Sequence, residues 1–171
     1  SRGPFSPDYV LYQIYDGTAT NPANCYVSEV IMPDSISRLS YGVFRKCKYL
    51  KSVKLPHKIT EIPDRAFSGC TALESCTLHE GIVSIGIAAF VGCKNLKEVI
   101  LEDNLTVLGA GMFKQCEALE EIKIPSTVKV IPESCFEECV SLKKIDIPEG
   151  VAVVENFAFK NCDALEEIVI A

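Results

Sequence analysis

Several features that would indicate a particular class of protein are missing from this sequence. It has no apolar run close to the about 20 residues that a membrane-spanning helix needs, so we expect no membrane insertion. Its 17 lysine and arginine residues are scattered and its formal net charge is -6, which disfavours a nucleic-acid partner. The chain starts at Ser1 without an apolar leader. Because a leader can be removed during maturation, this absence does not favour the cytoplasm.

Motifs of known enzyme chemistry are missing as well. The sequence contains no G-x-x-x-x-G-K-[ST], H-E-x-x-H or G-x-S-x-G motif, which bind phosphates, hold zinc or present a nucleophilic serine. Its two histidines, His57 and His79, fall beside the ends of predicted strands, and its carboxylates fall in columns that vary between repeats. We therefore predict a non-enzymatic protein that uses no cofactor and no metal.

The dominant feature that is present is a repeat of 23 residues. The motif Phe-x-x-Cys occurs six times at this spacing, and a leucine follows each cysteine three residues later. A unit of this length cannot bury its apolar side alone, whereas stacked copies can, with each copy contacting its neighbours. The repeat therefore predicts a solenoid with a structural ladder in its core. The ladder consists of Phe44, Phe67, Phe90, Phe113, Phe136 and Phe159 with Cys47, Cys70, Cys93, Cys116, Cys139 and Cys162.

Each repeat predicts two kinds of local structure. The segment LKSVKLP (50–56) alternates apolar and polar residues and ends in proline, as a short strand with one buried face does. The segment PDRAFSGC (63–70) places a proline and an aspartate ahead of Ala66 and Phe67, which predicts one short helical turn.

The repeat resembles that of the BspA-like, or treponemal-type, leucine-rich repeat proteins, L-x-x-I-x-I-P-x-x-V-x-x-I-G-x-x-A-F-x-x-C. The stretches LESCTLHEGIVSIGIAAFVGC and LKEVILEDNLTVLGAGMFKQC match it almost column by column, and the resemblance covers about residues 27–171. It implies an α/β repeat solenoid: a right-handed curved leucine-rich-repeat array with short strands on the concave side and short helical turns on the other side. We expect residues 1–26 to form an N-terminal cap and 27–171 the solenoid. Proteins of this family are mostly bacterial surface or secreted proteins, so the resemblance implies the cell surface or secretion, with the cytoplasm as the alternative.

The cysteines could bind metal, form disulfides or pack in the core, and their spacing favours packing. Equivalent cysteines of successive repeats should lie about 5 Å apart with parallel Cα–Cβ directions, which is poor disulfide geometry. Their thiols are expected to pack and to donate weak hydrogen bonds to turn carbonyls. Cys135 and Cys139 have a spacing that zinc ligands also use. Cys135, however, occupies a column of alanines and Cys76 a strand column, so both are interpreted as core residues, and Cys25 lies outside the array.

The strand side chains that point away from the core are expected to line the concave face of the solenoid. The inward columns keep their residue type from repeat to repeat, whereas the outward columns vary, so a partner can be recognised there without harm to the fold. Ile100 would add an exposed apolar anchor among charges. The predicted partner-binding residues are Glu98, Ile100, Glu121, Lys123, Lys144 and Asp146.

Two further columns carry regular patterns. The position before each strand alternates lysine and glutamate from Lys51 to Glu166, which predicts a ladder of ion pairs between repeats. Another column changes from polar residues to Val107, Val130 and Val153 in three adjacent repeats. These valines belong either to a local core or second sheet, or to an exposed stripe that contacts a partner.

Two functions are compatible with the sequence. The first is a non-enzymatic protein-binding or adhesion module that recognises a protein or extracellular-matrix ligand on the concave face. The second is a structural spacer or stalk within a larger surface protein, with no ligand of its own. The outward strand columns contain no aromatic residue, which keeps this alternative open. The chain stops at the close of a strand at Ala171, so we expect either a longer array or an end that stacks on another molecule, and the oligomeric state stays open.

Overall fold

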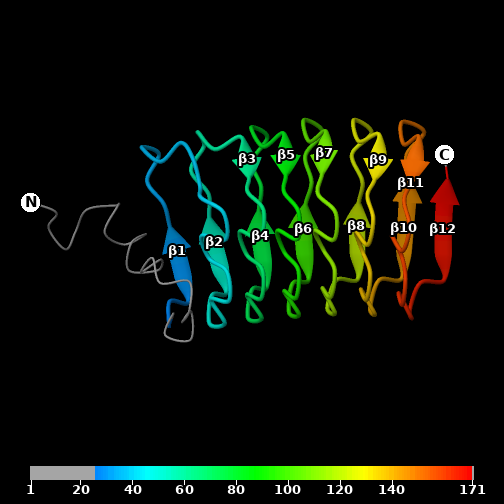
Figure 1. Ribbon diagram of the computed structural model, residues 1–171, viewed down its shortest axis with the longest axis horizontal. Helices are drawn as coiled ribbons and strands as arrows, with labels where there is room; N and C mark the ends of the chain where they lie inside the picture. The colour runs from blue at the N-terminus through cyan, green and yellow to red at the C-terminus, as the bar shows by residue number, and fades with distance from the viewer. Residues whose placement is uncertain (1–25, 171) are drawn as a thin grey trace, which may run out of the picture.

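The repeats form an elongated stack of short parallel strands (Figure 1). The computed structural model describes residues 26–170. Nearly the whole predicted cap, residues 1–26, lies outside this range, so the cap stays a prediction. Each repeat ends at the cysteine of its Phe-x-x-Cys motif, as in the repeats 94–116 and 117–139. Successive repeats lie side by side along the long axis of the molecule.

Two rows of strands run along this axis. The first row contains the strand that the leucine-rich pattern predicts in each repeat, and the second row contains a shorter strand after the chain has turned back. The first row consists of β1 (Glu29–Ile31), β2 (Ser52–Lys54), β4 (Ser75–Thr77), β6 (Glu98–Ile100), β8 (Glu121–Lys123), β10 (Lys144–Ile147) and β12 (Glu167–Ile170). The second row consists of β3 (Glu61–Ile62), β5 (Ser84–Ile85), β7 (Val107–Leu108), β9 (Val130–Ile131) and β11 (Val153–Val154).

The register of the strands follows from the repeat period. In β6 and β8 the middle residue is buried and its two neighbours are exposed, because successive side chains of a strand point to opposite faces. Paired strands place residues 23 positions apart beside each other, as in Ile145 beside Ile168. A slip by one residue would turn the buried side chains of a strand to solvent, so the period determines the register.

Both rows are interrupted at the same place. In the first row, β1, β2, β4 and β6 form one sheet and β8, β10 and β12 form another. In the second row, β3, β5 and β7 form one sheet and β9 and β11 form another. Both interruptions fall between the repeats 94–116 and 117–139, which we call the interrupted boundary.

The prediction of short helical turns is wrong, because the described residues contain no helix. Each turn that precedes a ladder cysteine contains two residues with positive φ, a left-handed conformation that a right-handed helix excludes. In the turn expected to be helical, these residues are Arg65 (φ 55°) and Gly69 (φ 73°). The chain is therefore a β-solenoid with irregular turns on its third side rather than an α/β repeat.

These turns are joined by a third set of hydrogen bonds, the turn layer. Alternate N–H groups of each turn donate to carbonyl groups of the next repeat. Examples are Arg65 N–H to the Ile87 carbonyl at 2.9 Å and Phe67 N–H to the Ala89 carbonyl at 2.8 Å. The turn layer satisfies backbone groups inside the stack, which offsets the cost of the left-handed residues.

The core contains a ladder of stacked phenylalanine rings. Neighbouring ring centroids are 5.1–5.8 Å apart, and the rings are close to parallel. The first five rings are fully buried, and Phe159 is partly buried. The thiols of the last five ladder cysteines, from Cys70 to Cys162, each donate to the carbonyl of the phenylalanine 26 residues earlier, at 3.0–3.4 Å. Packing and weak hydrogen bonding thus account for the evenly spaced Phe-x-x-Cys motifs.

Candidate partner-binding face

The predicted partner-binding residues lie on the outward side of the first row. Glu98 and Ile100 belong to β6, and the other four belong to β8 and β10. All six side chains are exposed, including Ile100 at 52%. The structure brings four of them together on one sheet and places β6 across the interrupted boundary. The neighbours in register on that sheet are Glu121 with Lys144 and Lys123 with Asp146.

Opposite charges on this face contact one another. The Lys144 ammonium lies 3.4 Å from the Asp146 carboxylate and 3.5 Å from that of Glu167. The hydrogen bond to Asp146 raises the pKa of Lys144 above its usual value. Because these groups are exposed, solvent and salt screen their attraction, so they organise the face more than they stabilise the fold.

An open hollow of about 520 Å³ lies on this face at the interrupted boundary. Its walls come from residues around the starts of β6 and β8 and from the loop that leads to β10. The lining residues are Lys97, Glu98, Ala118, Glu120, Glu121 and Ser141. The sequence predicts Glu98 and Glu121 as partner residues but misses the other four, because no column pattern distinguishes a position beside an interruption from its equivalents.

Only one ion pair of the predicted lysine–glutamate ladder forms within residues 26–170. This pair joins Lys143 to Glu120 at 2.5 Å. The hydrogen bond from Lys143 lowers the pKa of Glu120, and the more distant charge of Lys97 adds to the effect. The ladder prediction is therefore wrong for the other repeats, whose charges stay solvated.

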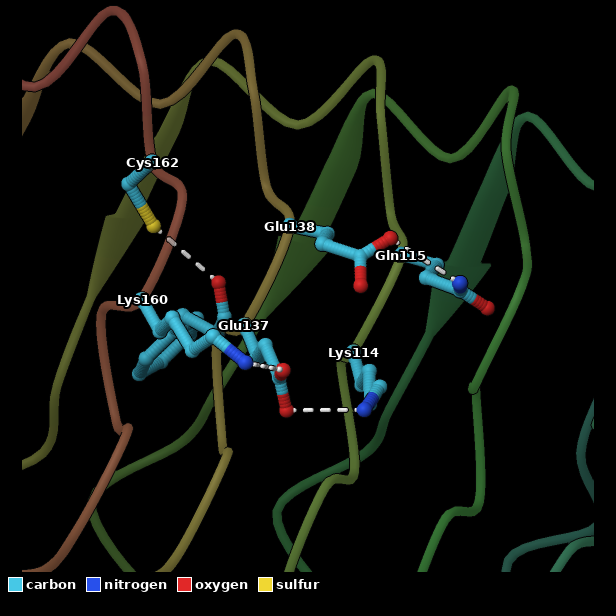
Figure 2. Close-up of polar contacts among 7 residues, drawn as sticks. Lys114, Gln115, Glu137, Glu138, Lys160 and Cys162 are labelled. Carbon is cyan, nitrogen blue, oxygen red and sulfur yellow. Dashed lines mark hydrogen bonds and ion pairs between the residues drawn. The ribbon is translucent and has the colours of Figure 1, made fainter.

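A buried carboxylate on the turn layer is missing from the sequence-based predictions. Glu137 is 5% exposed. Figure 2 shows Lys114 and Lys160 reaching it from the two adjoining repeats, at 2.8 and 3.2 Å. Hydrogen bonds from Lys114, then Ser134 and Lys160, lower the pKa of Glu137 to about 2, although burial acts in the opposite direction. The three charged residues share one column, so stacking places a carboxylate between two ammonium groups.

This cluster makes an acid-dependent contribution to stability. Because the folded-state pKa of Glu137 is about 2, the unfolded chain takes up this proton first, near the ordinary value of about 4.3. The contribution is complete above that value and is lost as pH falls through it toward about 2. We expect Glu137→Gln to lower the free energy of unfolding by about 1.5–3 kcal/mol at neutral pH and by little at about pH 2.

Denaturant unfolding of both proteins across this pH range measures the effect. The matched control is Glu138→Gln, because Glu138 is half-buried and contacts the neutral Gln115 at 3.0 Å. This control should show a smaller loss of stability. A loss for Glu137→Gln that does not change with pH would contradict the ion-pair interpretation.

The repeat matches one known family over most of the chain. The sequence pattern described as BspA type leucine rich repeat region (6 copies) matches residues 22–143 and 109–171. The chain belongs to the BspA-type leucine-rich repeat family. The resemblance of the repeats is thereby confirmed. No curated protein is significantly similar to the chain in sequence.

Solved structures of bacterial leucine-rich repeat proteins share this BspA-type fold. A leucine-rich repeat protein from Bacteroides ovatus is 30% identical, with a TM-score of 0.79 over 83% of this chain and 37% of its own. The T. pallidum leucine-rich repeat protein is 27% identical, with a TM-score of 0.74 over 83% of this chain and 69% of its own. A leucine rich cell surface protein from Faecalibacterium prausnitzii, at 24% identity, has a TM-score of 0.54 over 85% of this chain and 60% of its own. The chain thus spans 37% of the length of the first of these proteins.

Burial makes the cysteines of the BspA-type repeats poor nucleophiles. It raises the pKa of the Cys76 and Cys139 thiols to about 12, and that of the half-buried Cys162 thiol to about 11. The eight described cysteines form no disulfide. Since the thiolate is the reactive form, these side chains are structural.

We expect slow thiol labelling of the native protein. With an aromatic disulfide reagent at about pH 8, the cysteines of residues 26–170 should react far more slowly than a free thiol, and Cys162 should react first. In denaturant all nine cysteines of the chain should react promptly. Rapid native labelling of the ladder cysteines, or several disulfides found by mass spectrometry, would show that the packing interpretation is wrong.

The His79 ring makes two polar contacts shortly after the end of β4. His79 Nε2 lies 3.0 Å from the Pro56 carbonyl, and Gly81 N–H donates to His79 Nδ1 at 3.1 Å. A neutral ring with its proton on Nε2 satisfies both contacts.

The part of the chain that the structure describes contains no group of three or more His, Cys, Asp or Glu side chains placed to hold a metal ion. The same residues include no helix that is long and apolar enough to span a membrane.

The valine column forms part of the second row. Val107, Val130 and Val153 lie in β7, β9 and β11 and are 55%, 38% and 46% exposed. The valines thus belong to a second row of strands and also form an exposed stripe, while contact of this stripe with a partner stays a prediction.

Proposed function

We propose that this BspA-type protein is a non-enzymatic binding or adhesion module that recognises a protein or extracellular-matrix partner on the outward side of its first strand row. The observation that carries the proposal is the hollow of about 520 Å³ on a face whose strand side chains are exposed and mostly charged. Concave sites with a few converging polar groups are the usual form of binding sites.

The residues around the hollow support a protein partner. Ile100 is 52% exposed among charged neighbours, and an apolar anchor of this kind often dominates the energy of an interface. Glu98, Glu120 and Glu121 line the hollow together with one lysine. Their negative charge favours a partner that presents basic groups, because complementary potentials speed and orient association.

We also infer that the module works on the cell surface or in secreted form. The support is membership of a family whose proteins are mostly bacterial surface or secreted proteins. Antibodies against the solenoid should label intact cells of the source organism or precipitate the protein from the culture medium. Labelling only after cell lysis would contradict this location.

A structural spacer is the second candidate function. The observation that favours it is that none of the outward side chains of the described first-row strands is aromatic. Aromatic residues are enriched at the centres of protein interfaces. A spacer would need only a stiff stack, which the continuous core of buried side chains provides.

Charge reversal on the first row distinguishes the two functions. We expect the triple variant Glu98→Lys, Glu121→Lys, Lys144→Glu to lose at least about tenfold in affinity, because buried or close interfacial charges contribute more than about 1.4 kcal/mol when reversed. Binding is measured against a panel of extracellular-matrix proteins and cultured cells.

A control with the same change in net charge lies away from this face. It is the triple variant Glu61→Lys, Glu133→Lys, Lys129→Glu, whose residues are exposed and belong to the second row and the turns. This control should bind as the wild type does. Binding that survives the first-row reversals but is lost on Val107→Ser and Val130→Ser would place the site on the valine stripe. A wild-type protein that binds no member of the panel would favour the spacer.

A further inference from the structure

We propose that the interrupted boundary is a hinge at which the solenoid bends, with the turn layer as its pivot and the two strand rows as its opening side. This inference does not depend on the proposed binding function. It rests on four features of the same boundary: missing backbone bonds in both rows, a reinforced turn layer, a widened ring stack and the hollow.

The first row lacks a backbone bond that other repeats have. Lys143 N–H donates to the Glu120 carbonyl at 3.1 Å. Lys97 N–H likewise donates to the Glu74 carbonyl at 3.0 Å. The equivalent bond from Glu120 N–H to the Lys97 carbonyl, which would cross the interrupted boundary, is absent from residues 26–170.

The second row shows the same loss. Thr106 N–H donates to the Val83 carbonyl at 3.0 Å, before the interrupted boundary. Ala152 N–H donates to the Lys129 carbonyl at 2.8 Å, after it. No bond from Lys129 N–H to the Thr106 carbonyl joins the described strands across it.

One missing bond in the second row has a covalent cause. Glu155 N–H donates to the Ile131 carbonyl at 2.9 Å, one repeat after the interrupted boundary. At the boundary the equivalent position is Pro132, which has no N–H. The Leu108 carbonyl therefore cannot receive the corresponding bond, which among the described residues is also missing at Gly109, one repeat before the boundary.

The turn layer, in contrast, is continuous and reinforced across the interrupted boundary. Figure 2 shows two side-chain contacts that cross it, Lys114 with Glu137 at 2.8 Å and Gln115 with Glu138 at 3.0 Å. The Glu137 carboxylate is buried, so its attraction to Lys114 is screened less than that of a surface pair. The backbone bonds that accompany these contacts are Gly111 N–H to the Glu133 carbonyl at 2.8 Å, Phe113 N–H to that of Cys135 at 3.0 Å and Gln115 N–H to that of Glu137 at 2.8 Å.

The interior and the surface show the same asymmetry. Phe113 and Phe136 face each other across the interrupted boundary with centroids 5.8 Å apart, the widest step of the phenylalanine ladder. The hollow of about 520 Å³ lies at the same boundary on the first row. Opening is therefore concentrated on the strand side, while the turn side stays closed.

One backbone bond and two side-chain contacts limit how far the rows can separate. Ala118 N–H donates to the Lys94 carbonyl at 3.0 Å. The Thr127 hydroxyl donates to the Leu105 carbonyl at 2.6 Å, and Lys94 pairs with Glu117 at 2.7 Å. All three contacts cross the interrupted boundary outside the strands themselves. Because the strands themselves are not paired across this boundary as they are at the others, rotation about the turn layer costs less here. Such bending changes the width of the hollow and hence the spacing of the two halves of the face.

The test compares distances across two equal spans of the first row. Spin labels on cysteines introduced at Ile100 and Asp146 span two strand spacings that include the interrupted boundary. Labels at Lys54 and Ile100 span two spacings without it. Each pair has Cα atoms about 10 Å apart, within the range of dipolar broadening in frozen solution. The background carries Cys25→Ser and Cys162→Ser, because the other cysteines are buried.

We expect the distance distribution across the interrupted boundary to be about twice as wide as that of the control pair, because fewer bonds oppose its opening. Glu137→Gln should widen the Ile100–Asp146 distribution further and leave the Lys54–Ile100 distribution unchanged. Circular dichroism and the thermal transition establish that this variant is folded. Equal widths for the two pairs overturn the hinge, and no widening, or equal widening of both pairs, by Glu137→Gln overturns the turn layer as its pivot.

Discussion

The substitution Phe113→Ala is expected to lower the free energy of unfolding by about 3–5 kcal/mol, the range for truncating a buried aromatic side chain. The Phe113 ring is fully buried and stacks on Phe90 at 5.5 Å and on Phe136 at 5.8 Å. Its removal leaves a cavity between two rings that the rest of the ladder holds in place, so collapse of the site is limited. In a stack whose repeats contact only their neighbours, this loss falls on two interfaces at once.

Chemical denaturation of Phe113→Ala and the wild type measures this difference. The matched control is Phe157→Ala, because Phe157 is 57% exposed. The Lys160 ammonium lies over its ring, 5.3 Å from the ring centroid. We expect this control to lose less than about 1 kcal/mol, as surface substitutions usually do. An unchanged unfolding midpoint for Phe113→Ala would mean that the phenylalanine ladder is not the core.

The second large effect is expected for Gly109→Ala. A β-carbon at Gly109 would lie 2.2 Å from the Gly86 carbonyl carbon and 2.4 Å from the Ile87 nitrogen. These are backbone atoms of the preceding repeat, which cannot move aside as a flexible side chain can. We expect the substitution to cost at least about 3 kcal/mol, the upper part of the range for adding atoms to a packed site.

Gly111→Ala provides the control for Gly109→Ala within the same turn. Gly111 has φ 59° but open space around its missing β-carbon, where the nearest atom is Lys114 Cβ at 3.8 Å. Ala88 occupies the equivalent position with φ 53°, so an alanine is accommodated there. We expect a loss of about 1–2 kcal/mol from the left-handed conformation alone. A larger loss for Gly111→Ala than for Gly109→Ala would contradict the close approach of the two repeats.

The repeat period, the register and the identity of the core residues could be predicted from the amino-acid sequence. Inward residues such as Ile122 and Ile145 recur every 23 residues. A stack buries them only if equivalent residues of neighbouring repeats lie beside each other. The same argument places the phenylalanine and cysteine columns inside, where the structure has them. These features depend on apolar burial, which a periodic sequence expresses directly.

The conformation of the turns could not be predicted in this way. The proline and aspartate ahead of Ala66 favour a helical start locally, yet Arg65 adopts φ 55°. Its N–H then donates to the Ile87 carbonyl of the next repeat. Bonds between repeats stabilise this backbone, and they exist only once the stack has formed, so a local propensity does not indicate them.

The features most relevant to function depend on how neighbouring repeats approach one another. In the column of Lys97 and Glu120, lysine and glutamate alternate regularly, so the sequence does not distinguish one boundary between repeats from another. In the structure, however, β6 and β8 are unpaired at the boundary between these two residues, and a hollow forms there. Glu137 is a buried carboxylate that pairs twice, because its column holds a lysine in each adjoining repeat. The six residues proposed to bind a partner remain a prediction on a face whose two halves meet at this boundary. Composition and period describe a single repeat well, whereas small differences between repeats, such as the proline at Pro132, take effect only through the packing of one repeat on the next.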